Sequence, residues 1–352
     1  MLFLGQIMNL SKIQEIYFKD RKKVILIFAA LLILFLGAWL SWQKYFAVPE
    51  EDKLPPFALT GETGSIVGQI DFSQLTFPSS IQVTLSYKAT PLDNIFSDSA
   101  ASALASRFGF TGAPRKSSGR EAGEETWGFI NGLEEALTIN NKPREVIFSA
   151  ARRVGEGSLY DPSAGVEKAK QFLTDKNLPA DGLALVKTNY IKVNVGTTED
   201  PSQADFLEVY FAWSIGDRKI FGEGEAQTAI VLIFNRQGEV VYLKYVYLDS
   251  AFTKFSDVKL ISFAEASNQL REKGLVIFAL PLEGTVGEGE ASLDLLTFVP
   301  SRAELVYVQP QDSGFVYPVY LFEGKGTTDS GEVEASVYLL AVSPDYLRSS
   351  GE

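Results

Sequence analysis

Apolar residues along most of the chain alternate with polar ones, as they do in β-strands. Two such runs, 229–234 and 239–248, flank the sequence Asn-Arg-Gln-Gly at 235–238, which predicts a hairpin. Further strands are predicted at GSIVGQIDF, SIQVTLSYKA, TWGFI, EALTI, REVIFSA, YIKVNV, FLEVYFAWSI and at 302–309, 315–324 and 332–342. Pro318 lies inside the second of these last three runs, and it predicts an edge strand or a bulge there.

The segment 262–275 has the pattern of a helix with both ends marked. Ser262 followed by Glu265 predicts a capping box. Gly274 followed by Leu275 predicts that the helix ends in the left-handed conformation.

Two other segments, 161–178 and 97–110, have the same helical spacing and end at Asn177 and Gly109. When the three segments are aligned on their ends, Ala101, Ala169 and Ala266 share one position, which favours an internal repeat. Any three amphipathic helices could also align in this way.

These elements predict an α+β fold, in which one N-terminal transmembrane helix is followed by tandem modules of an amphipathic helix packed on antiparallel β-sheet. The expected modules are 66–160, 161–258 and 259–346, after a Pro/Gly-rich linker at 46–65 and before a short tail at 347–352.

The longest apolar run, residues 24–42, contains no charged side chain. As a helix it would be about 28 Å long, close to the hydrocarbon thickness of a bilayer. The expected anchor is therefore 24–45, with Val24, Leu32, Leu36, Trp39 and Trp42 in contact with lipid. A cleaved secretory signal would have a shorter apolar run and a small-x-small cleavage site, and a core helix would not be preceded by a basic cluster.

Basic residues crowd the N-terminal side of this run, at Lys19, Arg21, Lys22 and Lys23. The positive-inside rule places residues 1–23 in the cytoplasm and the rest of the chain outside the cell membrane. The whole chain carries a net charge of −12, with 32 basic and 44 acidic residues. Such an acidic chain argues against nucleic acid as a partner.

The chain contains neither cysteine nor histidine. Disulfides, thiol nucleophiles and thiolate metal sites are therefore excluded, and so are Ser-His-Asp and Cys-His catalysis. Ser41 and Lys44 have the spacing of a Ser-Lys pair but are better explained as the edge of the anchor. No phosphate-binding loop or dinucleotide fingerprint is found, and no cofactor is predicted.

The sequence Gly-Glu-Gly-Glu-Ala occurs twice, and its acids are Glu223, Glu225, Glu288 and Glu290. Paired carboxylates are weak candidates for calcium ligands, but a solvated turn before a strand explains them at least as well. Tyr307, Tyr317 and Tyr320 are candidates to line a binding groove, whereas Trp127 and Trp213 are expected in the core.

Three sets of residues carry a resemblance to a known family. They are the basic cluster and anchor at 19–42, the helices SDSAASALASRFGF, GVEKAKQFLTDKNL and SFAEASNQLREKGL, and the strands AELVYVQPQDSGFVYPVYLFEG and VEASVYLLAV. Together they resemble the YycH/YycI type of membrane-anchored regulator. Its external part is built from modules similar to PepSY domains. The resemblance implies a non-enzymatic protein that regulates a membrane partner, often a sensor kinase.

We therefore expect a single-pass, extracytoplasmic protein, anchored in the lipid bilayer through 24–45, that binds or regulates a membrane or cell-envelope protein. Two alternatives stay open at this point. One is an anchored hydrolase that uses Asp and Glu carboxylates, and the other is a structural spacer of the cell envelope.

Overall fold

A computed structural model describes Phe28 and residues 31–35, 48–60, 62–75, 82–92, 96–119, 123–132, 134–142, 144–193, 196–198, 200–222, 229–248, 250–281, 293–310 and 313–349. The chain forms two compact units, Met1–Lys53 and Leu54–Glu352. In the first unit, Phe28 and residues 31–35 are helical and exposed, and a 3-10 helix, η1, spans Glu50–Asp52.

The membrane-spanning helix predicted at 24–45 is not found among the residues that the structure describes. Within the described part of the chain, no helix is long and apolar enough to cross a membrane. A span requires about 20 residues of helix, and the described helical residues of this segment are Phe28 and 31–35. Leu32 is among them and is exposed. The other predicted anchor and topology residues lie outside the described residues, namely Val24, Leu36, Trp39, Trp42, Lys19, Arg21, Lys22 and Lys23.

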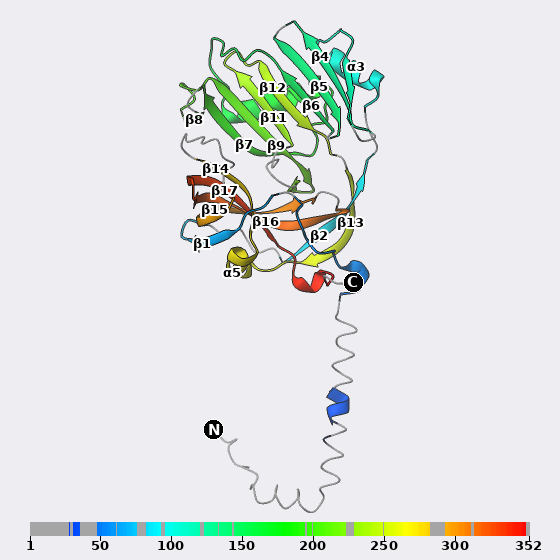
Figure 1. Cartoon of the computed structure of the whole chain (residues 1–352), viewed down its shortest axis with the longest axis vertical. Coiled ribbons are helices and arrows are strands. Elements are labelled where there is room, and N and C mark those ends of the chain that lie inside the picture. Colours follow the sequence, from blue (N-terminus) through cyan, green and yellow to red (C-terminus); the bar gives the residue numbers. More distant parts are fainter. Residues whose placement is uncertain are drawn as a thin grey trace, which may run out of the picture. The chain divides into compact units, whose positions relative to one another are not determined.

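The predicted series of separate helix-on-sheet modules is also wrong. The described residues are mainly β, and their 17 strands join into one mixed sheet system (Figure 1). The first two predicted modules merge because strand Arg144–Ser149 of one pairs with strand Val240–Val246 of the other, Leu243 opposite Phe148. This pairing removes two sheet edges that separate modules would have exposed. We call residues 96–248 the first lobe, and residues 54–91 with 250–349 the second lobe.

The first lobe is an antiparallel sheet in the order β3-β4-β5-β6-β12-β11-β9-β7-β8, with β10 forming a hairpin with β9. Its strands are β3 (Arg115–Ser118), β4 (Glu125–Asn131), β5 (Glu135–Asn141), β6 (Arg144–Ser149), β7 (Leu183–Lys192), β8 (Gly196–Thr198), β9 (Phe206–Ile215), β10 (Arg218–Phe221), β11 (Ile230–Asn235) and β12 (Val240–Val246). The hairpin predicted around 235–238 is confirmed as the β11–β12 connection.

The helices of this lobe are α3 (Asp98–Arg107) and α4 (Pro162–Asp175), and both are confirmed with their predicted ends. Gly109 and Asn177 have φ values of 93° and 55°, as the left-handed ending requires. The amide of Phe110 donates to the carbonyl of Ala105, and the amide of Leu178 donates to the carbonyl of Leu173. Phe110 and Leu178 are both buried. The two helices therefore end with the same hydrogen bonds.

The second lobe contains five strands that pair in the order β14-β17-β16-β15-β1, with β1 parallel to β15. They are β1 (Ile66–Ile70), β14 (Leu275–Pro281), β15 (Leu295–Val308), β16 (Phe315–Thr328) and β17 (Gly331–Leu340). Gly64 exchanges backbone hydrogen bonds with Val276 of β14, so the chain around β1 closes the strands into a ring. A Cβ on Gly64 would lie 2.3 Å from the carbonyl oxygen of Leu293, so this approach requires glycine.

A two-stranded ribbon, β2 (Val83–Pro91) and β13 (Ser250–Lys259), joins this lobe through β16. A second 3-10 helix, η2, spans Pro344–Tyr346. Leu54, which was placed in the predicted linker, is buried, and its amide donates to the carbonyl of Tyr346. Residues after 53 therefore pack on the second lobe.

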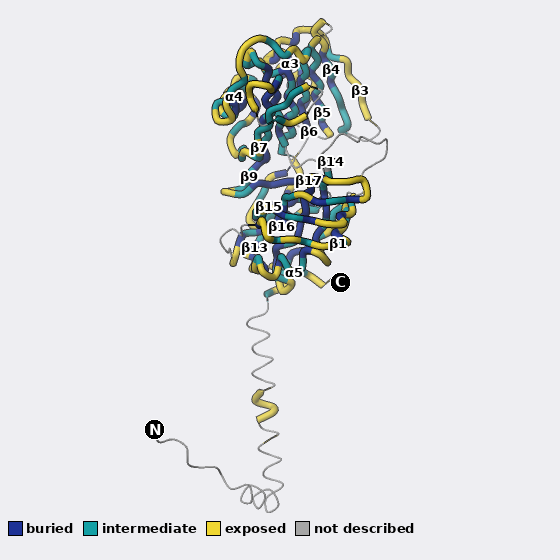
Figure 2. Tube along the Cα trace, turned by 90° about the vertical axis from the view of Figure 1, so that its left-hand side faces the viewer, coloured by how far each residue is buried: buried dark blue, intermediate teal, exposed yellow. Residues whose placement is uncertain are grey.

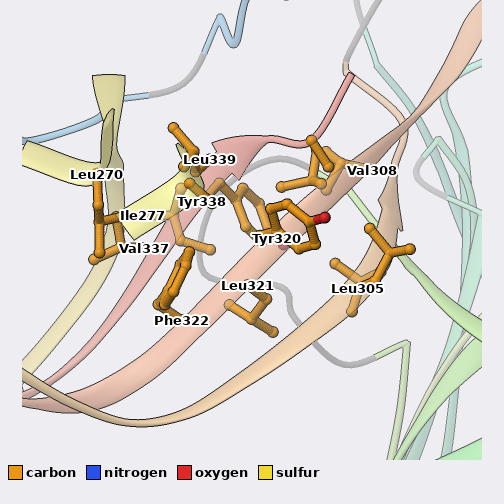
Figure 3. Packing of buried hydrophobic residues seen from close by; sticks show 14 of the residues in the cluster. Leu270, Ile277, Leu305, Val308, Tyr320, Leu321, Phe322, Val337, Tyr338 and Leu339 are labelled. Atoms are coloured by element: carbon orange, nitrogen blue, oxygen red, sulfur yellow. The ribbon is translucent and has the colours of Figure 1, made fainter. Parts of the chain in front are cut away.

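Helix α5 (Phe263–Lys273) packs on the ring, and Figure 3 shows Leu270 beside Ile277 and Val337. The capping box between Ser262 and Glu265 is confirmed. The left-handed ending at Gly274 is wrong, because its φ of −70° and ψ of 130° are extended. Since β14 begins at the next residue, the chain must already be extended at Gly274.

Neither alternative predicted for Pro318, an edge strand or a bulge, is found at this residue, and the register shift between β15 and β16 lies at Pro300 to Arg302 instead. At this residue β16 pairs with β15 through Tyr307, and β17 lies on its other side. The carbonyl of Pro318 accepts from the amide of Ala341, one residue after β17 ends. The N–H and C=O of one residue point to the same side of a strand, so an N–H at position 318 would point toward the end of β17. Because β17 has already ended there, proline removes no hydrogen bond between the two strands.

Candidate functional site: an uncovered sheet face

The sheet of the first lobe has one covered face. Helices α3 and α4 contribute to a single apolar cluster with every second residue of the strands below them, for example Val209, Leu232 and Leu243 (Figure 2). These residues lie in register across the sheet and are fully buried. The alternate residues therefore point to the opposite face, which no helix of the described chain covers.

That opposite face, here called the uncovered face, consists of two cross-strand rows. One row is Lys187, Tyr210, Val231, Lys244, Ile147, Thr138, Gly128 and Arg115, and the other is Asn189, Glu208, Ile233, Tyr242, Ser149, Ala136 and Ile130. Ile233 is buried in a small apolar cluster against which Val154 packs, so the chain near Val154 covers that part of the face. Most of the other residues are half-buried, and Ile130 is 58% exposed. An antiparallel sheet with one open face usually has polar residues there. This face instead mixes tyrosines and branched aliphatic residues with charges.

The first row carries three cations and no acid. Lys187 and Arg115 are exposed at its two ends, and half-buried Lys244 lies between Val231 and Ile147. None of the three cations forms an ion pair with any residue that the structure describes. We call these three residues the cation row. The Nζ of Lys187 lies 5.4 Å from the ring centre of Tyr210, within the range of a cation–π contact.

The acids of the uncovered face do not neutralise this row. The hydroxyl of Tyr210 donates to Oε2 of Glu208, and Asn140 donates to Oε1 of the buried Glu145 over 2.9 Å. Burial raises the pKa of Tyr210, and the carboxylate of Glu208 raises it further. Burial also raises the pKa of Tyr242. Both phenols are therefore neutral hydrogen-bonding groups at physiological pH.

A free strand edge lies beside this face. Within the described residues β3 pairs only with β4, and all four residues of β3 are exposed. Two of the four are Arg115 and Lys116, and charges of this kind protect an edge against pairing with another strand. Lys116 is also engaged, since its Nζ contacts Asp98 at 2.8 Å and Glu125 at 3.2 Å. The uncovered face therefore presents more unpaired cations to a partner than the edge strand β3 does.

The predicted groove tyrosines lie inside the protein. Tyr307, Tyr317 and Tyr320 are at most 2% exposed, and their hydroxyls donate to backbone carbonyls, as that of Tyr320 does to Ile261 over 2.7 Å (Figure 3). Trp127 and Trp213 are buried, as expected. The weak metal candidates Glu223, Glu225, Glu288 and Glu290 lie outside the described residues.

Four carboxylates of the described chain have a lowered pKa. Hydrogen bonds hold the pKa values of Asp98, Asp200, Glu265 and Asp294 below their usual ranges, from Lys116 in the first case and from serines in the others. A hydrolytic general acid requires a raised pKa instead. Within the described ranges, no group of three or more acids is placed to hold a metal ion.

The cation row was not predicted from the sequence. Alternation in 239–248 places Lys244 between Leu243 and Tyr245, which identifies it as facing away from the core side of its strand. Only the register across seven further strands brings it into line with Lys187 and Arg115.

Comparison with known proteins adds no family to this description. No model of a protein family matches the chain, and none of the curated proteins compared with it matches either. The resemblance to the YycH/YycI type therefore stays a prediction.

Proposed function

We propose that this chain is a non-enzymatic protein that binds, and thereby regulates, another protein through the uncovered face of its first lobe. Lys244 is the observation that carries the proposal. Its side chain is half-buried between two aliphatic residues and has no acidic partner in the described chain. A partner that covers this face would remove the ammonium group from water, which is unfavourable unless the partner supplies a counter-charge.

The composition of the face agrees with protein binding. Tyrosine and arginine are enriched at protein interfaces. Lysine is not, but its alkyl stem can cover apolar surface while its ammonium group stays in water. Ile147 adds aliphatic surface diagonally across from Tyr242, and Ile130 adds more at the end of the second row, three strands from Tyr242. The extracytoplasmic location of the chain stays a prediction.

Site-specific photo-crosslinking in cells tests the proposal. A photoreactive amino acid at Thr138, which lies in the first row, is expected to give a discrete adduct with another protein. The matched control places the same amino acid at Glu167, which is exposed on α4 on the covered side of the sheet. Equal crosslinking at both positions, or none at Thr138, would contradict the proposal.

A further inference from the structure

We propose that the partner of the uncovered face is an acidic polypeptide segment in extended conformation that runs along the cation row, across the strands. This inference rests on the proposed function and names the chemistry of its partner. It is carried by the spacing and the unpaired state of the three cations.

The spacing follows from the strand order. Lys187 on β7 and Lys244 on β12 are three strands apart, and Lys244 and Arg115 on β3 are four apart. Since neighbouring strands lie about 4.8 Å apart, the two gaps are about 14 Å and 19 Å.

An extended chain rises about 3.3 Å per residue, so these gaps correspond to about four and six residues. Both numbers are even, and residues an even number apart in an extended chain point to the same side. Carboxylates at positions i, i+4 and i+10 would therefore all face the sheet. Apolar residues between them would meet Val231 and Ile147, which separate the cations.

The same spacing disfavours a nucleic acid. A nucleic acid strand carries one phosphate per about 3.4 Å along a helix, so several phosphates would lie between Lys187 and Lys244 without a cation. Glu208, which lies in the neighbouring row, would repel them. A polypeptide can place its few acids at the cations and leave the intervening positions neutral.

Binding of synthetic peptides to the full chain, measured by fluorescence anisotropy at low salt, tests the inference. The probes are a peptide with Asp at i, i+4 and i+10, an isomer with the three Asp consecutive, and an oligothymidylate of equal length. The first peptide is expected to bind most tightly. Preference for the oligothymidylate, or equal affinity for the two isomers, would overturn the inference.

Variants of the protein provide the second arm. The triple variant K187Q, K244Q and R115Q is expected to bind the spaced peptide about tenfold more weakly, because it loses three charge pairs worth a few tenths of a kcal/mol each. The control triple variant K168Q, K325Q and R271Q removes the same charges from exposed positions elsewhere and is expected to change affinity less than twofold.

Two further results keep the inference falsifiable. The charge-conserving variant K187R, K244R and R115K is expected to retain binding, and loss of binding in it would contradict an electrostatic role for the row. If the row variant leaves the crosslink from Thr138 intact, the inference fails while the proposed function stands. If the unchanged chain gives no crosslink there, both fail.

Discussion

The ion pair between Lys219 and Glu304 offers a quantitative test of how the two lobes are joined. Lys219 lies on β10, which pairs with β9 of the first lobe and with β15 of the second. Its Nζ is 2.8 Å from Oε2 of Glu304 on β15, and the two side chains are 11% and 27% exposed. The same oxygen also accepts from Arg302, which is half-exposed. The pair is therefore asymmetric.

This asymmetry predicts unequal effects of removing either partner. The change Glu304→Gln leaves a buried Lys219 without a carboxylate, and an unpaired buried charge costs about 3 kcal/mol. The change Lys219→Met leaves Glu304 paired with Arg302 and partly solvated, so its cost is expected to be about 1 kcal/mol. The double variant is expected to recover about 2 kcal/mol relative to Glu304→Gln, because it removes the unpaired cation.

Urea unfolding of the four proteins measures these differences as shifts of the transition midpoint at constant slope. The control is Lys254→Met, which breaks a pair with Asp257 whose side chains are both more than half exposed, and no measurable shift is expected. The reasoning is refuted if Lys219→Met is as costly as Glu304→Gln, or if the double variant is no more stable than Glu304→Gln.

Three further predictions concern the first lobe. Leu243→Ala, at a fully buried position of the apolar cluster, is expected to cost about 2–5 kcal/mol in urea unfolding. Asn177→Gly is expected to stabilise α4 slightly and Asn177→Ala to destabilise it by about 1 kcal/mol, measured by thermal unfolding, because φ is 55°. Hydrogen bonds from Lys116 and Trp127 lower the pKa of Asp98 in the folded state. The stabilisation that they provide is therefore fully present above the pKa of the unfolded state, about 4, and is lost as the pH falls through the pKa of the folded state. Asp98→Asn is therefore expected to flatten the loss of stability below about pH 4, measured by urea unfolding at a series of pH values.

Local signals predicted α3, α4, α5 and the β11–β12 hairpin correctly, apart from the ending of α5 at Gly274. The capping box at Ser262 and the endings at Gly109 and Asn177 depend on residues within one or two turns, and these are visible in the sequence. The joining of strands β6 and β12 depends on two segments about a hundred residues apart, and nothing local marks it. For this reason most elements were predictable, whereas their assembly into one sheet was not. The strands that were not predicted from the sequence are β3, β8, β10, β13 and β14.

The candidate site was beyond prediction for a related reason. Alternation along one strand shows that Lys244 and its neighbours face different sides, but it does not show which distant cations share a row. Tyr317 and Tyr320 illustrate the opposite failure. Residues 316–322 of β16 are all buried, so this strand is covered on both faces and alternation does not identify exposed tyrosines there.

The net charge of −12 argued against nucleic acid as a partner, but it does not show which individual charges are already paired within the fold. Asp98 and Glu265 hold the starts of α3 and α5, and Glu208 accepts from a tyrosine of its own strand. These acids already have donors inside the fold, whereas Lys244 lies in the middle of the uncovered face and has no acidic partner among the described residues. A partner is recognised by charged groups that have no counter-charge within the protein itself. A chain with an excess of acidic residues can therefore still present a cationic surface to its partner.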